Sequence, residues 1–256
     1  SFTDWVAEVH NDAPGDPAPA ELVRQLNDER FHMVEHQRNF GGTATFNLFF
    51  AGCAEPYISI LEDDNWWEAP FLETMLAAMK DQSSVSLAWS NMRVWREEVD
   101  GTWTDTQQLV WPGETATAPR LIPWGAPRQA FGALHSNGAM LARSSARAFW
   151  VTPQVEFSGM ESFRERMVPG PLLFVPAPLA NFSVTRVTQR RDDRQTWATM
   201  QALLVATFAE SWATTADRIE ELWRYARAQP QRMSDVLLLA SFQDRSLARL
   251  RQPARL

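Results

Sequence analysis

Short apolar runs alternate with amphipathic segments along the first ninety residues. Runs of strand length occupy 5–9, 31–35 and 57–61, and a polar or glycine-containing turn follows each of the first two. The intervening segments 19–26, 43–53 and 69–80 have apolar residues at helical spacing. Strands and helices in this order predict an α/β fold, with a mostly parallel sheet covered by helices on both faces.

The middle of the chain continues with strands. We expect one strand at 85–89 and then a hairpin, 92–99 with 102–111, that turns at Asp100-Gly101. The segment 112–128 carries four prolines and no periodicity, which is typical of a functional or mobile loop. A strand at 139–142, a short helix at 159–167 and final strands at 172–175 and 181–187 complete this part.

The pattern changes after residue 190. Three helical segments are expected at 194–212, 216–228 and 234–250, and Thr214 and Asp217 have the spacing of a capping box at the second. We therefore divide the chain into an α/β domain, 1–190, and a C-terminal helical region, 191–256. The helical region is expected to pack on the α/β domain or on a partner, with an oligomer as one possibility.

Composition narrows the class of protein. The net charge of −7 and the lack of a basic stripe argue against nucleic acid as the main partner. The only cysteine, Cys53, cannot form an internal disulfide, and its apolar neighbours predict a buried thiol. Nothing therefore argues for an oxidising compartment, and we expect a cytoplasmic protein. No apolar run approaches the roughly 20 residues of a membrane span.

The most informative stretch is 57–67, in which an apolar run ends in Glu62, Asp63 and Asp64. Open α/β sheets bind ligands where strands end in this way. Three adjacent carboxylates repel one another, and a hard divalent cation such as Mg²⁺ or Mn²⁺ would neutralise them. The alternative is an acidic loop in which Asp64 or Asn65 caps the following helix. On spacing alone the two interpretations are level.

Two further polar elements lie at matching places. Asn11-Asp12-Ala13-Pro14-Gly15-Asp16 follows the first strand, and Asn39-Phe40-Gly41 precedes Asn47 by eight residues. Together with Leu61-Glu62-Asp63-Asp64-Asn65, in this order and spacing, they resemble a family 2 glycosyltransferase of the GT-A fold. The resemblance covers roughly residues 5 to 190, and it assigns 1–90 to the nucleotide-sugar half and 91–190 to the acceptor half.

The resemblance implies a role for each matched residue. Asp12 would accept a hydrogen bond from the nucleotide base, with uracil favoured, although an Asx-turn is the alternative. Asp63 would hold ribose or a metal-bound water, and Asp64 would ligate Mn²⁺ or Mg²⁺ at the diphosphate. Arg38, Asn39 and Gly41 would complete the nucleotide-sugar site. The implied donor is a UDP-sugar, and the acceptor is a glycan, a lipid-linked molecule or a small molecule.

An inverting sugar transfer also needs a carboxylate that takes the proton of the acceptor hydroxyl. Family members place such an acid at the start of a helix, followed by a basic residue, and Glu161 in Gly159–Arg166 fits this pattern. Favourable placement of Glu in the first turn of a helix is the alternative explanation. Glu156 and Glu165 are reserve candidates.

Two other groups carry weaker signals. His135 lies in a turn where it would contact the acceptor or the sugar. The arginines after the last strand would fold over the diphosphate or form a solvated surface with their acidic neighbours; they are Arg186, Arg190, Arg191 and Arg194, beside Asp192 and Asp193.

The sequence also departs from the family pattern. The family begins with a strand that contacts the nucleotide, and here the first visible strand corresponds to the second, so that a central strand is expected to be missing. Ala13-Pro14 stands where Gly-Ser is usual. These departures favour an alternative function, a catalytically inactive GT-A-like module that serves as a binding or scaffold partner. A nucleotidyltransferase is a third and weaker hypothesis.

Overall fold

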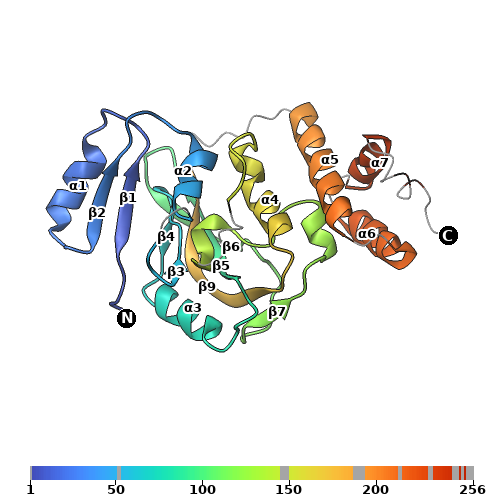
Figure 1. Ribbon diagram of the computed structural model, residues 1–256, viewed down its shortest axis with the longest axis horizontal. Coiled ribbons are helices and arrows are strands. Elements are labelled where there is room, and N and C mark those ends of the chain that lie inside the picture. Colours follow the sequence, from blue (N-terminus) through green and yellow to red (C-terminus); the bar gives the residue numbers. More distant parts are fainter. Residues whose placement is uncertain are drawn as a thin grey trace.

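A computed structural model describes residues 2–50, 53–144, 150–186, 194–212, 215–229 and 233–243, together with 248 and 251. Two sheets and their helices form the α/β part, and three further helices follow at the C-terminal end (Figure 1). The mixed α/β class predicted from the sequence is confirmed.

The first two strands form a small sheet of their own. β1 (Ala7–Asn11) pairs in parallel with β2 (Phe31–Glu35), and α1 (Ala18–Leu26) connects them. This unit lies at one end of the molecule, beside α2 (Gly42–Leu48) (Figure 1). We expected the strands that end near Asp12 and Asp64 to share one sheet. That expectation was wrong, because β1 and β2 pair only with each other.

The second sheet has seven strands. Its main path runs β3-β8-β5-β9-β4, with β6 paired to β5 and β7 to β9. Only β5 and β9 are parallel, and every other pair in this sheet is antiparallel. The prediction of a mostly parallel sheet was therefore wrong. The strands are β3 (Tyr57–Ile58), β4 (Trp66–Trp67), β5 (Leu87–Glu97), β6 (Trp103–Leu109), β7 (Arg120–Ile122), β8 (Met140–Arg143) and β9 (Leu172–Val184).

Two central strands are longer than predicted. β5 joins the expected strand at 85–89 to the first arm of the hairpin, and β9 joins the two expected final strands. Pro176 and Pro178 do not end β9, because the register with β5 shifts between Ser90 and Asn91 at this point. A proline without an N–H is tolerated at such a bulge. The side chain of Asn91 compensates there by bonding the backbone of Trp111.

Helices cover both faces of the large sheet. α3 (Phe71–Met79) buries Phe71, Met75 and Met79 against one face. Phe46 of α2 packs with Trp89 and Phe174 on the other. α4 (Met160–Met167) lies on the same side as α2 (Figure 1). Tertiary anchors also hold α2, because the amide of Asn47 bonds both the N–H and the C=O of Val151.

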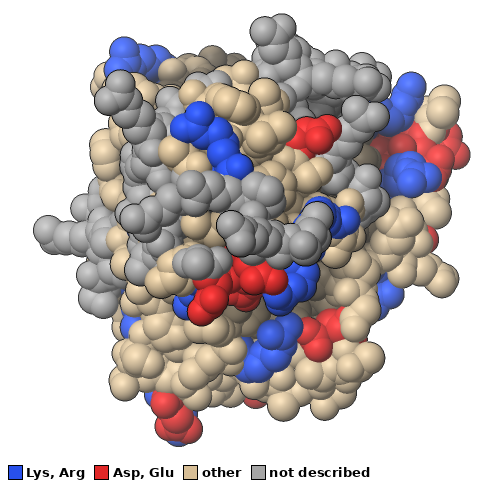
Figure 2. All heavy atoms as spheres, turned by 90° about the vertical axis from the view of Figure 1, so that its right-hand side faces the viewer, with Lys and Arg blue, Asp and Glu red and all other residues tan. Residues whose placement is uncertain are grey.

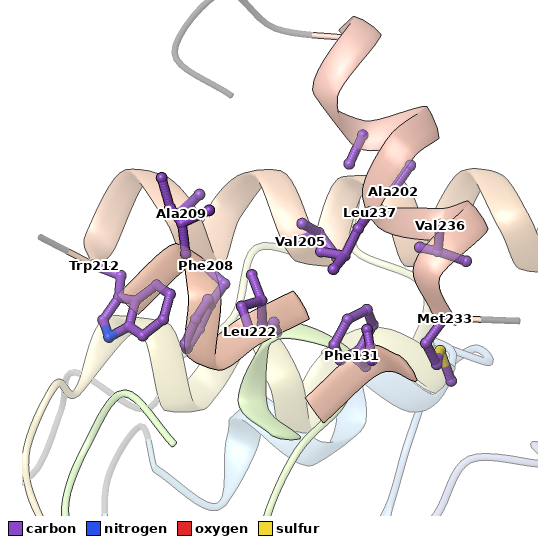
Figure 3. Close-up of a cluster of buried hydrophobic side chains, with 14 residues drawn as sticks. Phe131, Ala202, Val205, Phe208, Ala209, Trp212, Leu222, Met233, Val236 and Leu237 are labelled. Carbon is purple, nitrogen blue, oxygen red and sulfur yellow. The ribbon is translucent and has the colours of Figure 1, made fainter. Parts of the chain in front are cut away.

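The C-terminal helices are α5 (Arg194–Ser211), α6 (Ala216–Ala228) and α7 (Met233–Gln243). They enclose a cluster that contains Phe208, Leu222 and Leu237, and Phe131 joins it from the α/β part (Figure 3). α6 is capped by Thr215, whose side chain accepts from the N–H of Arg218. The predicted cap, Thr214, lies outside the described residues. On α7, Leu238, Leu239 and Phe242 are exposed, and oligomer formation through these helices stays a prediction.

Two surface features complete the description. Cys53 is exposed, so the predicted burial of its thiol was wrong. Among the described helices, none combines the length and the hydropathy that crossing a membrane would need. On the face seen in Figure 2, acidic and basic side chains of the described residues are interspersed, and neither sign forms a continuous patch.

Candidate active site

The acidic motif leaves the large sheet directly after β3. Ile60 is buried in the core, and the hydroxyl of Ser59 donates to the carbonyl of Met140 on β8. These contacts fix the chain up to Leu61, and the following residues turn at the surface. Asp63 is exposed and Asp64 is half-buried. Within the described residues, no hydrogen bond or ion pair engages either carboxylate, so both are available to a cation.

Glu62 points inward, unlike its two neighbours. Its Oε2 accepts from Nδ2 of Asn65 at 2.9 Å. Burial raises the pKa of Glu62 to about 7, and the nearby negative charges of Glu161 and Asp64 raise it further. The hydrogen bond from Asn65 acts in the opposite direction. Negative charge is thus crowded at this edge of the sheet, which is the physical condition that favours a bound cation.

A short loop before β8 connects the acidic motif to α4. The indole N–H of Trp67 donates to the carbonyl of Gly138 at 2.7 Å, and the N–H of Asn137 donates to Oε1 of Glu161 at 2.6 Å. A Cβ on Gly138 would overlap Oε2 of Glu62. The predicted base and the acidic motif therefore both contact one three-residue 3₁₀ turn, Asn137–Ala139.

Arg164 is the buried cation of this cluster. Its Nη1 contacts Nε2 of His135 and Oδ1 of Asn137, and its guanidinium lies 5.1 Å from the ring centre of Phe50. Burial lowers its pKa to about 10, although the charges of Glu161, Glu165 and Glu62 act in the opposite direction. The positive charge of Arg164 offsets part of the repulsion among the three glutamates.

Glu165 and His135 form the most buried polar pair. The carboxylate of Glu165 accepts from Nε2 of Gln129, from the N–H groups of Leu134 and His135, and from Nδ1 of His135, at 2.7 to 2.9 Å. Burial opposes ionisation of Glu165, but the hydrogen bond from His135 and the others outweigh it and lower the pKa. Because arginine only donates, Nε2 of His135 is the acceptor in its contact with Arg164.

Two sequence predictions fail at this pair. The side chains of His135 and Glu165 are 0% and 1% exposed. His135 therefore cannot contact an acceptor or a sugar, and Glu165 is not a reserve base. Both residues instead fix the segment between Gln129 and Asn137 against α4. Glu156, the other reserve, is exposed.

Asp12 lies in a second cluster, at the end of β1. Its Oδ1 accepts from Nδ1 of His36 at 2.9 Å and from the N–H of Phe40 at 2.7 Å, and its Oδ2 accepts from the N–H of Gly41 at 3.0 Å. Burial works to raise the pKa of Asp12, but these hydrogen bonds outweigh it and lower the pKa. Asp12 is therefore an ionised acceptor that closes the loop 36–41.

The other predicted nucleotide-binding residues lie in the same loop. Arg38 and Asn39 are exposed, and Gly41 has φ +80°, a conformation that glycine adopts readily. Beside them is an open hollow of about 560 Å³ lined by Glu35, His36, Gln37, Arg38 and Phe40. The loop thus brings Asp12, Arg38, Asn39 and Gly41 together. Of the arginines after the last strand, Arg190 and Arg191 lie outside the described residues, and the N–H of Arg186 donates to Glu97.

Sequence reasoning missed three residues of these clusters. The sequence analysis placed His36 in a loop without a role. It included Arg164 only within the helix-start pattern around Glu161, and it treated Glu62 in the same way as Asp63 and Asp64. No local signal distinguishes His36 and Arg164, because their partners lie far away in the sequence, whereas Glu62 bonds Asn65, three residues on. For Arg164, the contacts are with His135 and Asn137.

The residues present fit a magnesium or manganese ion. Among the described residues, no three histidine, cysteine or acidic side chains form a ready-made metal cage. Such a cage is not needed, since Mg²⁺ in phosphate-transfer sites is held by one or two carboxylates together with substrate phosphates and water. Asp63 and Asp64 supply two hard oxygen ligands of this kind.

Comparisons with known proteins agree with this geometry. The family model described as "Glycosyl transferase family 2" matches residues 9–132. The structure of S. aureus TarS 1-349 in complex with UDP-GlcNAc is similar with a TM-score of 0.60 at 10% identity, over 96% of this chain and 74% of that chain. No curated protein matches the sequence.

Two more TarS structures give the same result. A structure of S. aureus TarS 1-349 has a TM-score of 0.59 at 10% identity, over 96% of this chain and 80% of that chain. The complex of TarS 1-349 with UDP has a TM-score of 0.51 at 11% identity, with the same two coverages. At these identities the likeness shows the fold alone, and the predicted GT-A fold is confirmed.

Replacing Glu165 by Gln tests the buried pair. The amide would turn an N–H toward groups that donate, and we expect a loss of about 3 kcal/mol in the free energy of unfolding at pH 7. Chemical denaturation measures this. Glu21→Gln, in the exposed ion pair with Arg24 on α1, is the matched control and should leave the free energy of unfolding nearly unchanged.

The same pair of variants has a pH signature. Folding lowers the pKa of Glu165. The contribution of its carboxylate to the free energy of unfolding is therefore fully present above the pKa in the unfolded chain, about 4.3. That contribution is lost as the pH falls through the pKa in the folded protein. The stability difference between the wild type and Glu165→Gln should therefore shrink below about pH 4. A difference that is constant from pH 7 to pH 3 would contradict an ionised Glu165.

Proposed function

We propose that this chain is a member of glycosyl transferase family 2, whose model matches residues 9–132, and that it transfers a sugar from a UDP-sugar to an acceptor hydroxyl, with inversion and with Mn²⁺ or Mg²⁺. The observation that carries this proposal is the turn Asn137–Ala139. It contacts Glu62, Trp67 and Glu161, so that the acidic motif and a candidate base meet at the same turn.

In this proposal each cluster has one task. Asp12 accepts a hydrogen bond from an N–H of the base, and Arg38, Asn39 and Gly41 surround it. Asp64 ligates the metal and Asp63 holds ribose or a metal-bound water. When bound, the metal supplies positive charge at the diphosphate, where negative charge develops as the nucleotide leaves. The TarS complex with UDP-GlcNAc supports a nucleotide sugar as the donor.

Glu161 takes the proton of the acceptor hydroxyl. One of its oxygens, Oε1, accepts from the N–H of Asn137, which fixes the carboxylate and leaves its other oxygen for the acceptor. The buried guanidinium of Arg164 lies near enough for the charge of Glu161 to oppose the lowering of the Arg164 pKa by burial. A base needs this combination of fixed position and negative charge.

The first prediction from the proposed function concerns the metal. Binding of UDP should strengthen with Mn²⁺ or Mg²⁺, and Asp64→Asn should abolish that gain without changing the fold, because an amide is a much weaker ligand for a hard cation. Calorimetry with and without metal measures both quantities. Glu73→Gln on α3 is a control for the loss of one negative charge. Metal-independent binding, unchanged in Asp64→Asn, would rule out the proposed metal site.

The second prediction concerns Glu161. Glu161→Gln keeps an oxygen that can accept from Asn137 but cannot take a proton, so turnover should fall by ~10²–10⁴-fold. The affinity for UDP should barely change. Turnover and UDP binding are measured side by side, with Glu156→Gln as the matched control. Normal turnover in Glu161→Gln would remove this residue from the mechanism.

The wild type also tests the alternative function. If the wild type binds UDP but neither transfers the sugar to any acceptor nor hydrolyses the donor, an inactive GT-A-like module would be favoured. The clusters around Asp12 and Asp64 would then serve recognition only.

The third prediction concerns the proline-rich segment. Within it, 113–119 lies between Pro112 and β7, and Glu114 accepts from the N–H of Ala116 and from Arg120, both nearby in the sequence. We expect this part to order over the donor. Cleavage after Glu114 by a glutamate-specific protease should slow when UDP and Mn²⁺ are present, whereas cleavage after Glu98 in the hairpin turn should not. Equal rates at Glu114 with and without ligand would contradict the prediction.

A further inference from the structure

A chain of four side chains crosses the small sheet and ends at Asp12. Glu8 and His10 belong to β1, and His36 follows β2. Oε2 of Glu8 lies 3.2 Å from Nε2 of His10, Nδ1 of His10 lies 3.1 Å from Nε2 of His36, and Nδ1 of His36 lies 2.9 Å from Oδ1 of Asp12. The proposed role of Asp12 does not use the first three residues.

Both imidazoles are largely removed from solvent. The side chains of His10 and His36 are 8% and 3% exposed. The ring of His10 meets Phe49 of the α2 C-terminus edge to face at 4.8 Å, and the ring of His36 lies 4.8 Å from that of Phe40. Aromatic contacts therefore hold the rings, and the nitrogen atoms have few partners besides one another.

Counting protons fixes the tautomers. Each contact needs one proton between its two atoms, because two lone pairs or two N–H groups that face each other repel. Asp12 is ionised, so the proton of its contact with His36 sits on Nδ1 of His36. A neutral His36 then offers a lone pair at Nε2, and Nδ1 of His10 donates to it. Two protons satisfy both inner contacts.

A third proton has only one place to go. It fits on Nε2 of His10, facing Glu8, whose side chain is 60% exposed and free to turn toward solvent. The contact of His36 with Asp12 is therefore the same whether the pair of histidines is neutral or carries this third proton. In the neutral pair, His10 supports the tautomer of His36 that Asp12 requires, because Nδ1–H of His10 meets the lone pair on Nε2 of His36.

We propose that His10 and His36 are positioning residues for nucleotide recognition: His10 holds His36 in the Nδ1–H tautomer, and His36 fixes the carboxylate of Asp12. This inference rests on the proposed function in that Asp12 receives the base. Without His10, the Nε2–H tautomer of His36 becomes available, and it turns a lone pair toward the carboxylate of Asp12. The acceptor would then be displaced from the base.

Three variants separate positioning from packing. His36→Phe keeps a ring against Phe40 and removes the donor to Asp12. His36→Asn places an amide N–H near the position of Nδ1 and restores that donor. His10→Phe keeps the contact with Phe49 and removes the donor to His36. Circular dichroism and thermal unfolding establish that each variant is folded.

The readout is the Kd for UDP with Mn²⁺, measured by calorimetry. We expect His36→Phe and His10→Phe to weaken binding about tenfold, the effect of losing one hydrogen bond to a charged group, and His36→Asn to bind close to the wild type. In the His36→Asn background, His10→Phe should have no further effect, because no imidazole tautomer remains to be controlled. Wild-type affinity in His36→Phe, or an equal loss in His36→Asn, would overturn the inference.

Ring ¹⁵N shifts test the proton count without any nucleotide. The protein has four histidines, and single-histidine variants assign them. We expect His36 to carry its proton on Nδ1 in the wild type and to gain the Nε2–H form in His10→Phe. A wild-type Nε2–H tautomer would overturn the inference even if a variant failed to fold. Absence of UDP binding by the wild type would instead contradict the proposed donor, while the ring shifts would still decide the tautomer.

Discussion

One buried carboxylate holds together the part of the candidate site that contains Glu161. Glu165 accepts four hydrogen bonds from Gln129, Leu134 and His135, and so it ties the segment before β8 to α4. The position of the turn Asn137–Ala139 depends on this tie, and the same turn contacts Trp67 and Glu161. A buried charge is costly unless its hydrogen-bonding capacity is satisfied. The carboxylate of Glu165 meets this condition, and its hydrogen bonds hold the turn beside Glu161, the proposed base.

The two ends of the site are built on separate supports. Asp12 belongs to the small sheet, whereas Asp64 follows a strand of the large one. α2 links them, because Phe49 at its end contacts His10, and Thr43 and Asn47 bond the backbone of Val155 and Val151. Since the small sheet pairs with no strand of the large one in the described residues, the hydrogen bonds of Asp12 with His36, Phe40 and Gly41 give the nucleotide end its own rigidity.

Local signals predicted the elements well and the long-range pairing poorly. Phe31–Glu35 and Ala216–Ala228 were predicted with the observed bounds, because periodicity and breakers act within a few residues. The continuity of β9 through Pro176 and Pro178 was missed, since it depends on a register shift against β5. For the site, the three motifs predicted roles for Asp12 and Asp64, and the helix-start pattern predicted one for Glu161; these roles stay predictions. The burial of His135 and the contact of His36 with Asp12 depend on residues 24 or more positions away, which no local pattern records.

We propose that the two separately supported ends bind one nucleotide sugar together with a metal. A crystal structure with UDP and Mn²⁺, with the ion located by its anomalous signal, would test this directly. We expect an Mn²⁺ peak about 2.0–2.6 Å from a carboxylate oxygen of Asp64 and from diphosphate oxygens. We also expect a base N–H within hydrogen-bond distance of Asp12. A UDP that binds without touching Asp12, or an Mn²⁺ ion without contact to Asp64, would contradict this proposal.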